Sequence, residues 1–209
     1  TVLWLVSMTN TYNFMDGLDA LAAVSGIGFL VTLSAVAHLG LTPAQPLLIV
    51  ACLATAGALG GFLVHNRPPA KVFMGDGGAL FIGALLAAVV VAVTSGGSRG
   101  AGGVPLIVAL LPVWSFLWDA TFTMIFRIVK REDWLRPHRR HLFQRLVVSG
   151  WSHARVRRLY FAICALGCGG SIAWLLGPPL VRVAVGAVTV AGSAGLAWYV
   201  GRTERRATV

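Results

Sequence analysis

Long apolar runs alternate with short polar breaks along the chain, and this pattern predicts a bundle of membrane-spanning helices. A helix needs about 20 apolar residues to cross the hydrocarbon core of a bilayer. Six runs come close to this length, at approximately 18–38, 46–64, 79–95, 104–126, 159–177 and 181–200. Residues 1–8 are apolar but too few to cross, so we interpret them as the last turns of one more helix. The predicted fold is an all-α polytopic membrane protein with six complete transmembrane helices and the end of another.

The breaks between the runs carry turn-forming residues. Gly and Pro punctuate the chain at 40–43, 67–69, 96–103 and 177–179. The sequence shows no internal repeat and no second domain, so residues 1–209 are expected to form a single transmembrane domain. Because the first helix is incomplete, we expect the chain to be the C-terminal part of a longer protein.

The composition excludes a soluble domain. Of the 209 residues, 57% are hydrophobic and only 11% are charged, and the mean hydropathy is +0.80. Soluble domains carry about 25% charged residues. Cys52, Cys164 and Cys168 all fall inside apolar runs and form no CxxC motif, so neither a zinc site nor a disulfide framework is supported.

The basic residues are unevenly distributed, and their distribution predicts an orientation. The formal net charge is +10; ten of the 17 Lys and Arg residues fall in the segment 127–158, three in the tail and two in the segment 65–78. If each run crosses once, these regions and residues 9–17 lie on one side, with only Arg99 and Arg182 opposite. The positive-inside rule makes that side cytoplasmic, with 127–158 as a basic loop, and no nucleic acid is needed to explain the charge.

Residues 10–23 carry the densest group of polar side chains beside a membrane run. Asn10, Asn13, Asp16 and Asp19 fall within ten positions of a chain that has only seven acidic residues. Asp16 could cap the following helix with Asp19 at its third position, or the two could share a helix face. Capping leaves both Asn residues unexplained. Since polar groups in a membrane are costly, we favour a site for a cation or a polar ligand.

A second polar group lies in the glycine-rich stretch 71–83. Asp76 stands between Gly75 and Gly77, just before a membrane run. Backbone N–H groups at a helix start favour phosphate oxygens and a carboxylate favours a hard cation, so the stretch fits a phosphate and metal cradle. A simple glycine-rich helix entry is the alternative.

A third group interleaves Arg and His at 136–145, within the basic segment. Arg side chains bind pyrophosphate through charge-assisted hydrogen bonds. A polybasic patch on anionic lipid is the alternative, although it explains the interleaved His residues less well. Further along the fourth complete run, Asp119 is either a functional acid or half of a structural ion pair, for example with Arg127.

Carboxylates, a glycine turn and an Arg/His cluster on one face predict a site for a charged phosphate compound, and long helices offer a lateral route for a lipid. These features favour phosphoryl transfer between a water-soluble donor and a membrane-embedded acceptor. The alternative is a non-enzymatic protein, either degenerate or a transporter. Transporters place ionisable residues near the membrane midplane, whereas these cluster at one edge.

At these residues the sequence resembles the polyprenyl-phosphate N-acetylhexosamine-1-phosphate transferase superfamily (bacterial glycosyltransferase family 4). Residues 10–22 match its NxxNxxDGxDGLA pattern, with Ala20 in place of the usual Gly. Residues 73–79 match its FMGDxGS pattern, with Ala79 in place of Ser, and residues 137–144 resemble its His/Arg loop. The resemblance covers essentially the whole chain, as the C-terminal two-thirds of a family member.

The resemblance implies transfer of a sugar-1-phosphate from a UDP-N-acetylhexosamine to polyprenyl (undecaprenyl) phosphate, with Mg²⁺ or Mn²⁺ as cofactor. The products would be a polyprenyl-diphospho-sugar and UMP, formed at the cytoplasmic face of the bacterial inner membrane, with a homodimer as one assembly to consider. The implied catalytic residues are Asp16, Asp76 and His141, of which Asp16 and Asp76 bind the metal. The implied substrate-binding residues are Asn10, Asn13, Gly17, Leu18, Asp19, Asn66, Phe73 and Arg139.

Two departures from the family pattern bear on these expectations. The family's adjacent Asp pair lies on an earlier helix and has no counterpart in this chain, so we expect the chain alone to be inactive. The basic loop reads His-Arg-Arg-His rather than the HHH-type pattern of the muramoyl-pentapeptide enzyme. This difference favours the branch that initiates O-antigen or other surface polysaccharides.

Overall fold

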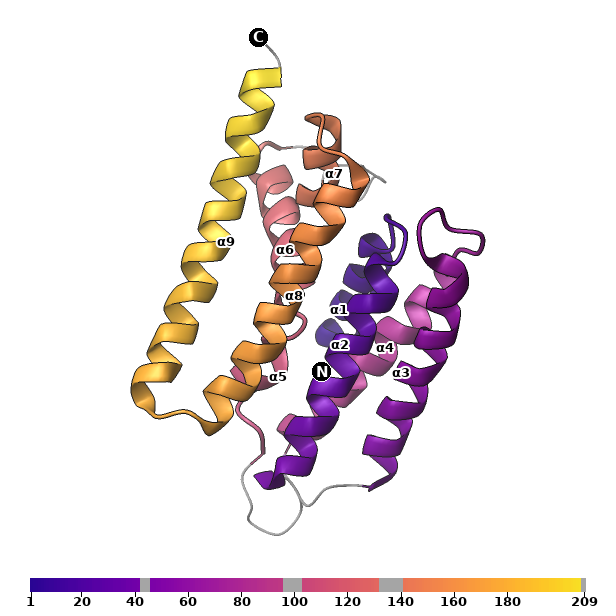
Figure 1. The fold of residues 1–209 in the computed structure, drawn as a ribbon. Coiled ribbons are helices and arrows are strands. Elements are labelled where there is room, and N and C mark those ends of the chain that lie inside the picture. Colours follow the sequence, from indigo (N-terminus) through magenta and orange to yellow (C-terminus); the bar gives the residue numbers. More distant parts are fainter. Residues whose placement is uncertain (42–45, 96–102, 132–140, 208–209) are drawn as a thin grey trace.

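The computed structural model describes residues 1–41, 46–95, 103–131 and 141–207. Within these ranges the chain is helical and contains no β-strand (Figure 1), so the predicted all-α class is confirmed. The helices are α1 (Val2–Met15), α2 (Leu21–Val36) with a π-helical turn after it (Ala37–Leu41), α3 (Pro46–Asn66), α4 (Gly75–Thr94), α5 (Leu106–Leu110), α6 (Trp114–Val129), α7 (Leu142–Val148), α8 (His153–Leu176) and α9 (Pro179–Ala207).

Five helical segments in the described ranges are long and apolar enough to cross a membrane. They are α2 together with the start of its π-helical turn (Leu21–Leu39), α3, α4, α8 and α9. The remaining predicted run, 104–126, differs from the prediction of one continuous helix, because it is divided into α5 and α6. Pro112 lies at the division, and it has no N–H to continue the helical hydrogen bonds. The first helix, α1, has 14 residues and is about 21 Å long, too short to cross by itself.

The connection between α1 and α2 corrects a second prediction. Asp16 is the C-cap of α1, and its N–H donates to the Asn13 carbonyl (3.2 Å). The following helix begins only at Leu21, after Ala20, whose left-handed backbone (φ 64°) interrupts the helix. Asp16 and Asp19 therefore lie in a non-helical turn, residues 16–20. The expectation that they cap one helix or share its face is wrong.

The first helix packs against α2, α4 and α6, and it forms part of the core. Tyr12 is fully buried, and its hydroxyl donates to the Ala22 carbonyl (2.6 Å). Trp4 donates from its indole to the Ala87 carbonyl on α4 (3.0 Å). A Cβ on Gly83 would lie 2.8 Å from the Thr9 Cα, so the backbones of α1 and α4 touch at this glycine.

Three segments that carry the sequence motifs lie at one end of the bundle, which we call the polar end (Figure 1). They are the turn 16–20, the segment 67–74 between α3 and α4, and α7. The α8–α9 connection lies at the opposite end. Residues 127–158, predicted as a loop, are partly helical because they include the end of α6, all of α7 and the start of α8.

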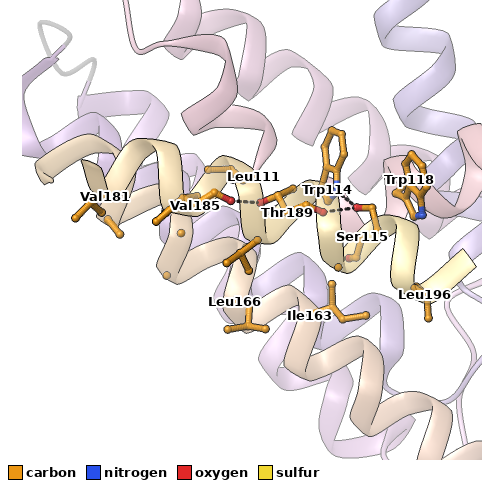
Figure 2. Close-up of a pocket in the computed structure, with 18 residues that line it drawn as sticks. Leu111, Trp114, Ser115, Trp118, Ile163, Leu166, Val181, Val185, Thr189 and Leu196 are labelled. Carbon is orange, nitrogen blue, oxygen red and sulfur yellow. Dashed lines mark hydrogen bonds between the residues drawn. The ribbon is translucent and has the colours of Figure 1, made fainter. Parts of the chain in front are cut away.

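An apolar cavity of about 410 Å³ lies between α6, α8 and α9 (Figure 2). The Trp114 indole donates to the Ser193 hydroxyl beside it (2.8 Å), which joins α6 to α9. None of the 18 residues that line the cavity is ionisable. This cavity therefore offers nothing to bind a charged phosphate compound, and the candidate site must be sought at the polar end.

The contact between α1 and α4 gives a stability prediction. We expect Gly83→Ala to lower the free energy of unfolding by about 1–3 kcal/mol, because the new methyl group meets backbone atoms that cannot move aside. The matched control is Gly57→Ala on α3, where a Cβ has open space. That variant should keep or raise the stability, since Ala favours a helix. Thermal unfolding in detergent measures both, and equal melting temperatures for the two variants would contradict the predicted contact.

Candidate functional site

The turn 16–20 is held in place by hydrogen bonds to residues that lie far along the chain, between Asn66 and Val72. Asn66, the last residue of α3, is buried, and its Oδ1 accepts from the Ala20 N–H (2.8 Å). The Asn66 Nδ2 donates to the Val72 carbonyl (2.9 Å). Asp19 completes the connection, since its Oδ2 accepts from the Ala70 N–H (3.1 Å). These bonds fasten the first motif to the segment 67–74, which precedes the second.

The backbone conformation of Ala20 explains why the family pattern has Gly at this position. A left-handed backbone costs an L-residue about 1–2 kcal/mol, whereas glycine adopts it freely. The hydrogen bond that the Ala20 N–H donates to Asn66 Oδ1 offsets part of this cost in the present chain. The turn thus keeps its shape although Ala replaces Gly.

Asp16 and Asp76 approach one another across the polar end. Asp76 is exposed in the first turn of α4, directly after Gly75, whose φ is +65°. Asp16 is half-buried, and burial followed by the negative charge of Asp76 raises the pKa of its carboxyl to about 6. The charge of Asp76 thus adds to burial in disfavouring the ionised form of Asp16, and a cation near both carboxylates would oppose that effect.

The two carboxylates fit Mg²⁺ better than a softer metal. Mg²⁺ is bound in proteins through one or two carboxylates, with water and substrate phosphate oxygens completing its coordination. The part of the chain that the structure describes holds no cluster of three or more His, Cys, Asp or Glu side chains that would enclose a metal fully. Asp16 and Asp76 thus offer the open oxygen site that a phosphate-bound Mg²⁺ requires.

Helix α7 brings the third motif to the first. The His141 ring, at the N-cap of α7, lies 5.4 Å from the Phe14 ring, measured between centroids. A Cβ on Gly17 would lie 2.9 Å from Phe143 Cζ, so the Phe143 ring packs directly on the turn 16–20. Only a residue without a side chain permits this contact.

A buried carboxylate lies beneath α7. Asp119 on α6 is fully buried, and its oxygens accept from the Leu142 N–H (2.8 Å) and the Phe143 N–H (3.2 Å). The Tyr160 hydroxyl of α8 lies 2.5 Å from Asp119 Oδ2, and the His141 Nδ1 lies 3.2 Å from Oδ1. Asp119 therefore joins α6, α7 and α8 at the polar end. The sequence suggested Arg127 as one possible partner, whereas the structure places His141 beside the carboxylate.

Most of the predicted site residues lie together at the polar end. The turn 16–20 contributes Asp16, Gly17, Leu18 and Asp19. The others are Asn66 at the end of α3, Phe73 just before α4, Asp76 in the first turn of α4, and His141 at the N-cap of α7. Phe73 is 72% exposed, so its ring is open to a ligand, whereas Asn66 and Leu18 are buried and shape the turn from inside.

The remaining predicted residues lie differently. Asn13 precedes Asp16 by three residues on α1, a spacing that places the two on neighbouring positions of one face, and Asn10 lies a further three residues back. The Asn10 Nδ2 donates to the Val6 carbonyl of its own helix (2.7 Å). Arg139 lies outside the described residues.

Sequence reasoning did not find the roles of Phe143 and Tyr160. Both residues are apolar enough to be expected in a core, and each is buried. The only sequence signal at Tyr160 is a hydroxyl within an apolar run, which needs a partner when it is buried.

The comparisons with known proteins agree with this geometry. Residues 1–94 match the family described as glycosyl transferase family 4. The chain is 34% identical, over 84% of its length and 49% of the relative's, to the "Probable undecaprenyl-phosphate N-acetylglucosaminyl 1-phosphate transferase" of Bacillus subtilis (strain 168).

Two further relatives show the same relationship. Identity is 34% to the decaprenyl-phosphate N-acetylglucosaminephosphotransferase of Mycobacterium tuberculosis (strain H37Rv), over 94% of this chain and 52% of that protein. It is 32% to the phospho-N-acetylmuramoyl-pentapeptide-transferase of Nostoc sp. (strain PCC 7120), over 78% of this chain and 42% of that protein.

The three motifs share the polar end of the bundle, and two of them fall within residues 1–94, which match glycosyl transferase family 4. Over most of its length the chain is thus similar to proteins named as polyprenyl-phosphate N-acetylglucosamine-1-phosphate transferases. It spans about half the length of the curated relatives it matches.

The connection through Asn66 gives a second stability prediction. Asn66→Ala leaves the Ala20 N–H and the Val72 carbonyl without their partner, so we expect a loss of about 2–4 kcal/mol in the free energy of unfolding. The control is Asn10→Ala, whose side chain bonds only to its own helix and should change stability by less than about 0.5 kcal/mol. Thermal unfolding in detergent tests both, and an Asn66→Ala protein as stable as the control would refute the role of Asn66.

Proposed function

We propose that the protein transfers N-acetylhexosamine-1-phosphate from a UDP-sugar to polyprenyl phosphate. An oxygen of the lipid phosphate forms a bond to the phosphorus that carries the sugar. The bond from this phosphorus to the bridging oxygen breaks, and UMP leaves with that oxygen. The observation that carries the proposal is the common location of three segments at the polar end: the turn 16–20 with Asp16, the start of α4 with Asp76, and the start of α7 with His141.

The residues of the polar end divide this work between them. Asp16 and Asp76 would hold Mg²⁺, which supplies positive charge beside the diphosphate of the donor. The exposed Phe73 offers an aromatic face for the uracil ring. Asn66 and Asp19 support the pocket through the backbone bonds they make, and Gly17 leaves room for Phe143.

The basic residues of the third motif would meet the negative charge of the donor. His141 lies beside Phe14 and the turn 16–20, and it is buried in this structure, so we assign its contact with the sugar or the phosphates from the family pattern. We assign Arg139 the same role from the family pattern, although it lies outside the described residues. Such groups would offset the negative charge of the donor phosphates, so the donor would repel the incoming lipid phosphate less strongly.

The donor sugar and the setting complete the proposal. We propose N-acetylglucosamine as the sugar, because the two relatives named for N-acetylglucosamine cover 84% and 94% of this chain. The basic residues at 127–158 support a cytoplasmic polar end at a bacterial plasma membrane. The product would begin a surface polysaccharide or another envelope glycan, and a homodimer remains part of the proposal.

A transporter explains the polar end less well. Transporters bind their substrates near the membrane midplane, on discontinuous helices. In the described residues Asp16, Asp19 and Asp76 all lie at one end of the bundle. The broken pair α5–α6 instead borders the apolar cavity.

The central role of Asp76 can be tested by Asp76→Asn. We expect at least a roughly 100-fold loss of Mg²⁺-dependent transfer from a UDP-sugar to polyprenyl phosphate, since the amide binds a cation weakly. Stability should not change, because Asp76 is exposed. Radiolabelled sugar-phosphate appearing in the lipid fraction measures the activity.

The control for this experiment is Arg182→Gln, which also removes a charge but lies at the start of α9, at the opposite end of the bundle. It should retain full transfer. Wild-type activity in Asp76→Asn, with Mg²⁺ still required, would refute the metal assignment. No transfer by the full-length wild-type protein with any UDP-N-acetylhexosamine would refute the proposed function itself.

A further inference from the structure

Asp119 is buried too deeply to meet a substrate, yet it touches a residue of the candidate site. Its exposure is 0%, and each of its oxygens has more than one partner. Oδ1 meets the Leu142 N–H, the His141 Nδ1 and the Thr123 hydroxyl. Oδ2 meets the Phe143 N–H and the Tyr160 hydroxyl. A role in function, if it has one, must therefore act through another residue.

The hydrogen-bond partners of Asp119 bear on the tautomer of His141. Two of the partners are backbone N–H groups, which can only donate. The Tyr160 hydroxyl approaches the same Oδ2 as one of them, at 2.5 Å. An ionised carboxylate accepts all of these bonds, whereas a protonated one would compete with them for its own proton. Because an ionised carboxylate has no proton to give, the His141 Nδ1 must carry one.

A fixed proton on Nδ1 makes Nε2 the atom through which His141 changes its hydrogen-bonding role. The neutral ring is then an acceptor at Nε2, and a second proton turns Nε2 into a donor. Phe14 and Phe143 flank the ring, at centroid distances of 5.4 and 6.1 Å, so the ring has little freedom to rotate.

The far end of α7 is held independently of Asp119. Arg145 donates from Nε and Nη2 to the two carboxylate oxygens of Glu204 on α9, at 2.6 Å each. Its guanidinium also lies over the Phe126 ring of α6, 5.0 Å from the centroid. Loss of the Asp119 carboxylate would therefore disturb the His141 end of α7 more than its position as a whole.

We propose that Asp119 is a positioning residue, whose carboxylate orients the His141 ring and holds the proton on Nδ1. This arrangement sets the ring for the role toward the donor that we propose for His141. This inference rests on the proposed function for its kinetic consequence. Its structural part, the Nδ1–H tautomer, holds whichever substrate the site takes.

The test is Asp119→Asn, which keeps the shape of the side chain but removes its charge. We expect kcat to fall roughly 10- to 100-fold, the loss typical when a carboxylate that orients a functional His is removed. The KM for the UDP-sugar should change by less than kcat does. In a protein that already carries His141→Gln, the same substitution should cost less than about 3-fold, because the ring it positions is gone.

The control variant is Ser171→Ala, which removes another buried hydrogen bond, from the Ser171 hydroxyl to the Val108 carbonyl (2.7 Å). It joins α8 to α5 away from His141, so it should lower the melting temperature without lowering kcat. A melting temperature for each variant separates loss of folded protein from loss of rate.

Nitrogen-15 NMR of the histidine rings gives a readout that does not depend on activity. The signal that disappears in His141→Gln should show an Nδ1–H tautomer in the wild-type protein and a changed tautomer population in Asp119→Asn. Two results would overturn the inference. One is an unchanged ring signal in Asp119→Asn. The other is that Asp119→Asn lowers kcat as much in the His141→Gln protein as it does in the wild-type protein. If the wild-type protein transfers no sugar-phosphate but the ring signals behave as expected, the proposed function fails and the positioning survives.

Discussion

The fold of the polar end depends on a carboxylate that has no access to water. An isolated buried charge is very costly, so Asp119 requires donors, and the chain supplies them from α7, α8 and α6 itself. Two of these donors are backbone N–H groups that the first turn of α7 would otherwise leave without partners. One carboxylate thereby determines where a short helix begins, although seven residues would not form a stable helix alone.

The other half of the polar end is built from neutral hydrogen bonds instead. Asn66 joins the turn 16–20 to the segment 67–74, and the backbone contact at Gly83 fixes α1 against α4. The groups that this framework leaves accessible are the ones suited to a nucleotide and a cation, Asp76 and Phe73 above all. Rigid, buried supports thus surround exposed chemical groups, as a site that must orient a diphosphate requires.

The sequence predicted the helical class and the common location of the motifs, because both follow from hydropathy and from counting crossings. It predicted the turn at Asp16 wrongly, since helix capping rules see only local residues while the left-handed Ala20 is stabilised by Asn66, 46 positions away. The partnership of Asp119 with Tyr160 spans 41 positions and leaves no local pattern either. The break at Pro112 had a sequence signal, but the apolar run around it concealed that signal.

The central claim is that the three motifs form one site for a UDP-sugar and a cation. The most direct measurement is a structure of the protein in a lipid nanodisc, determined with a UDP-N-acetylhexosamine and Mg²⁺. We expect density for the diphosphate between the Asp76 carboxylate and the His141 ring, with the uracil beside Phe73. Nucleotide density at any other place, with the polar end occupied by solvent alone, would contradict it.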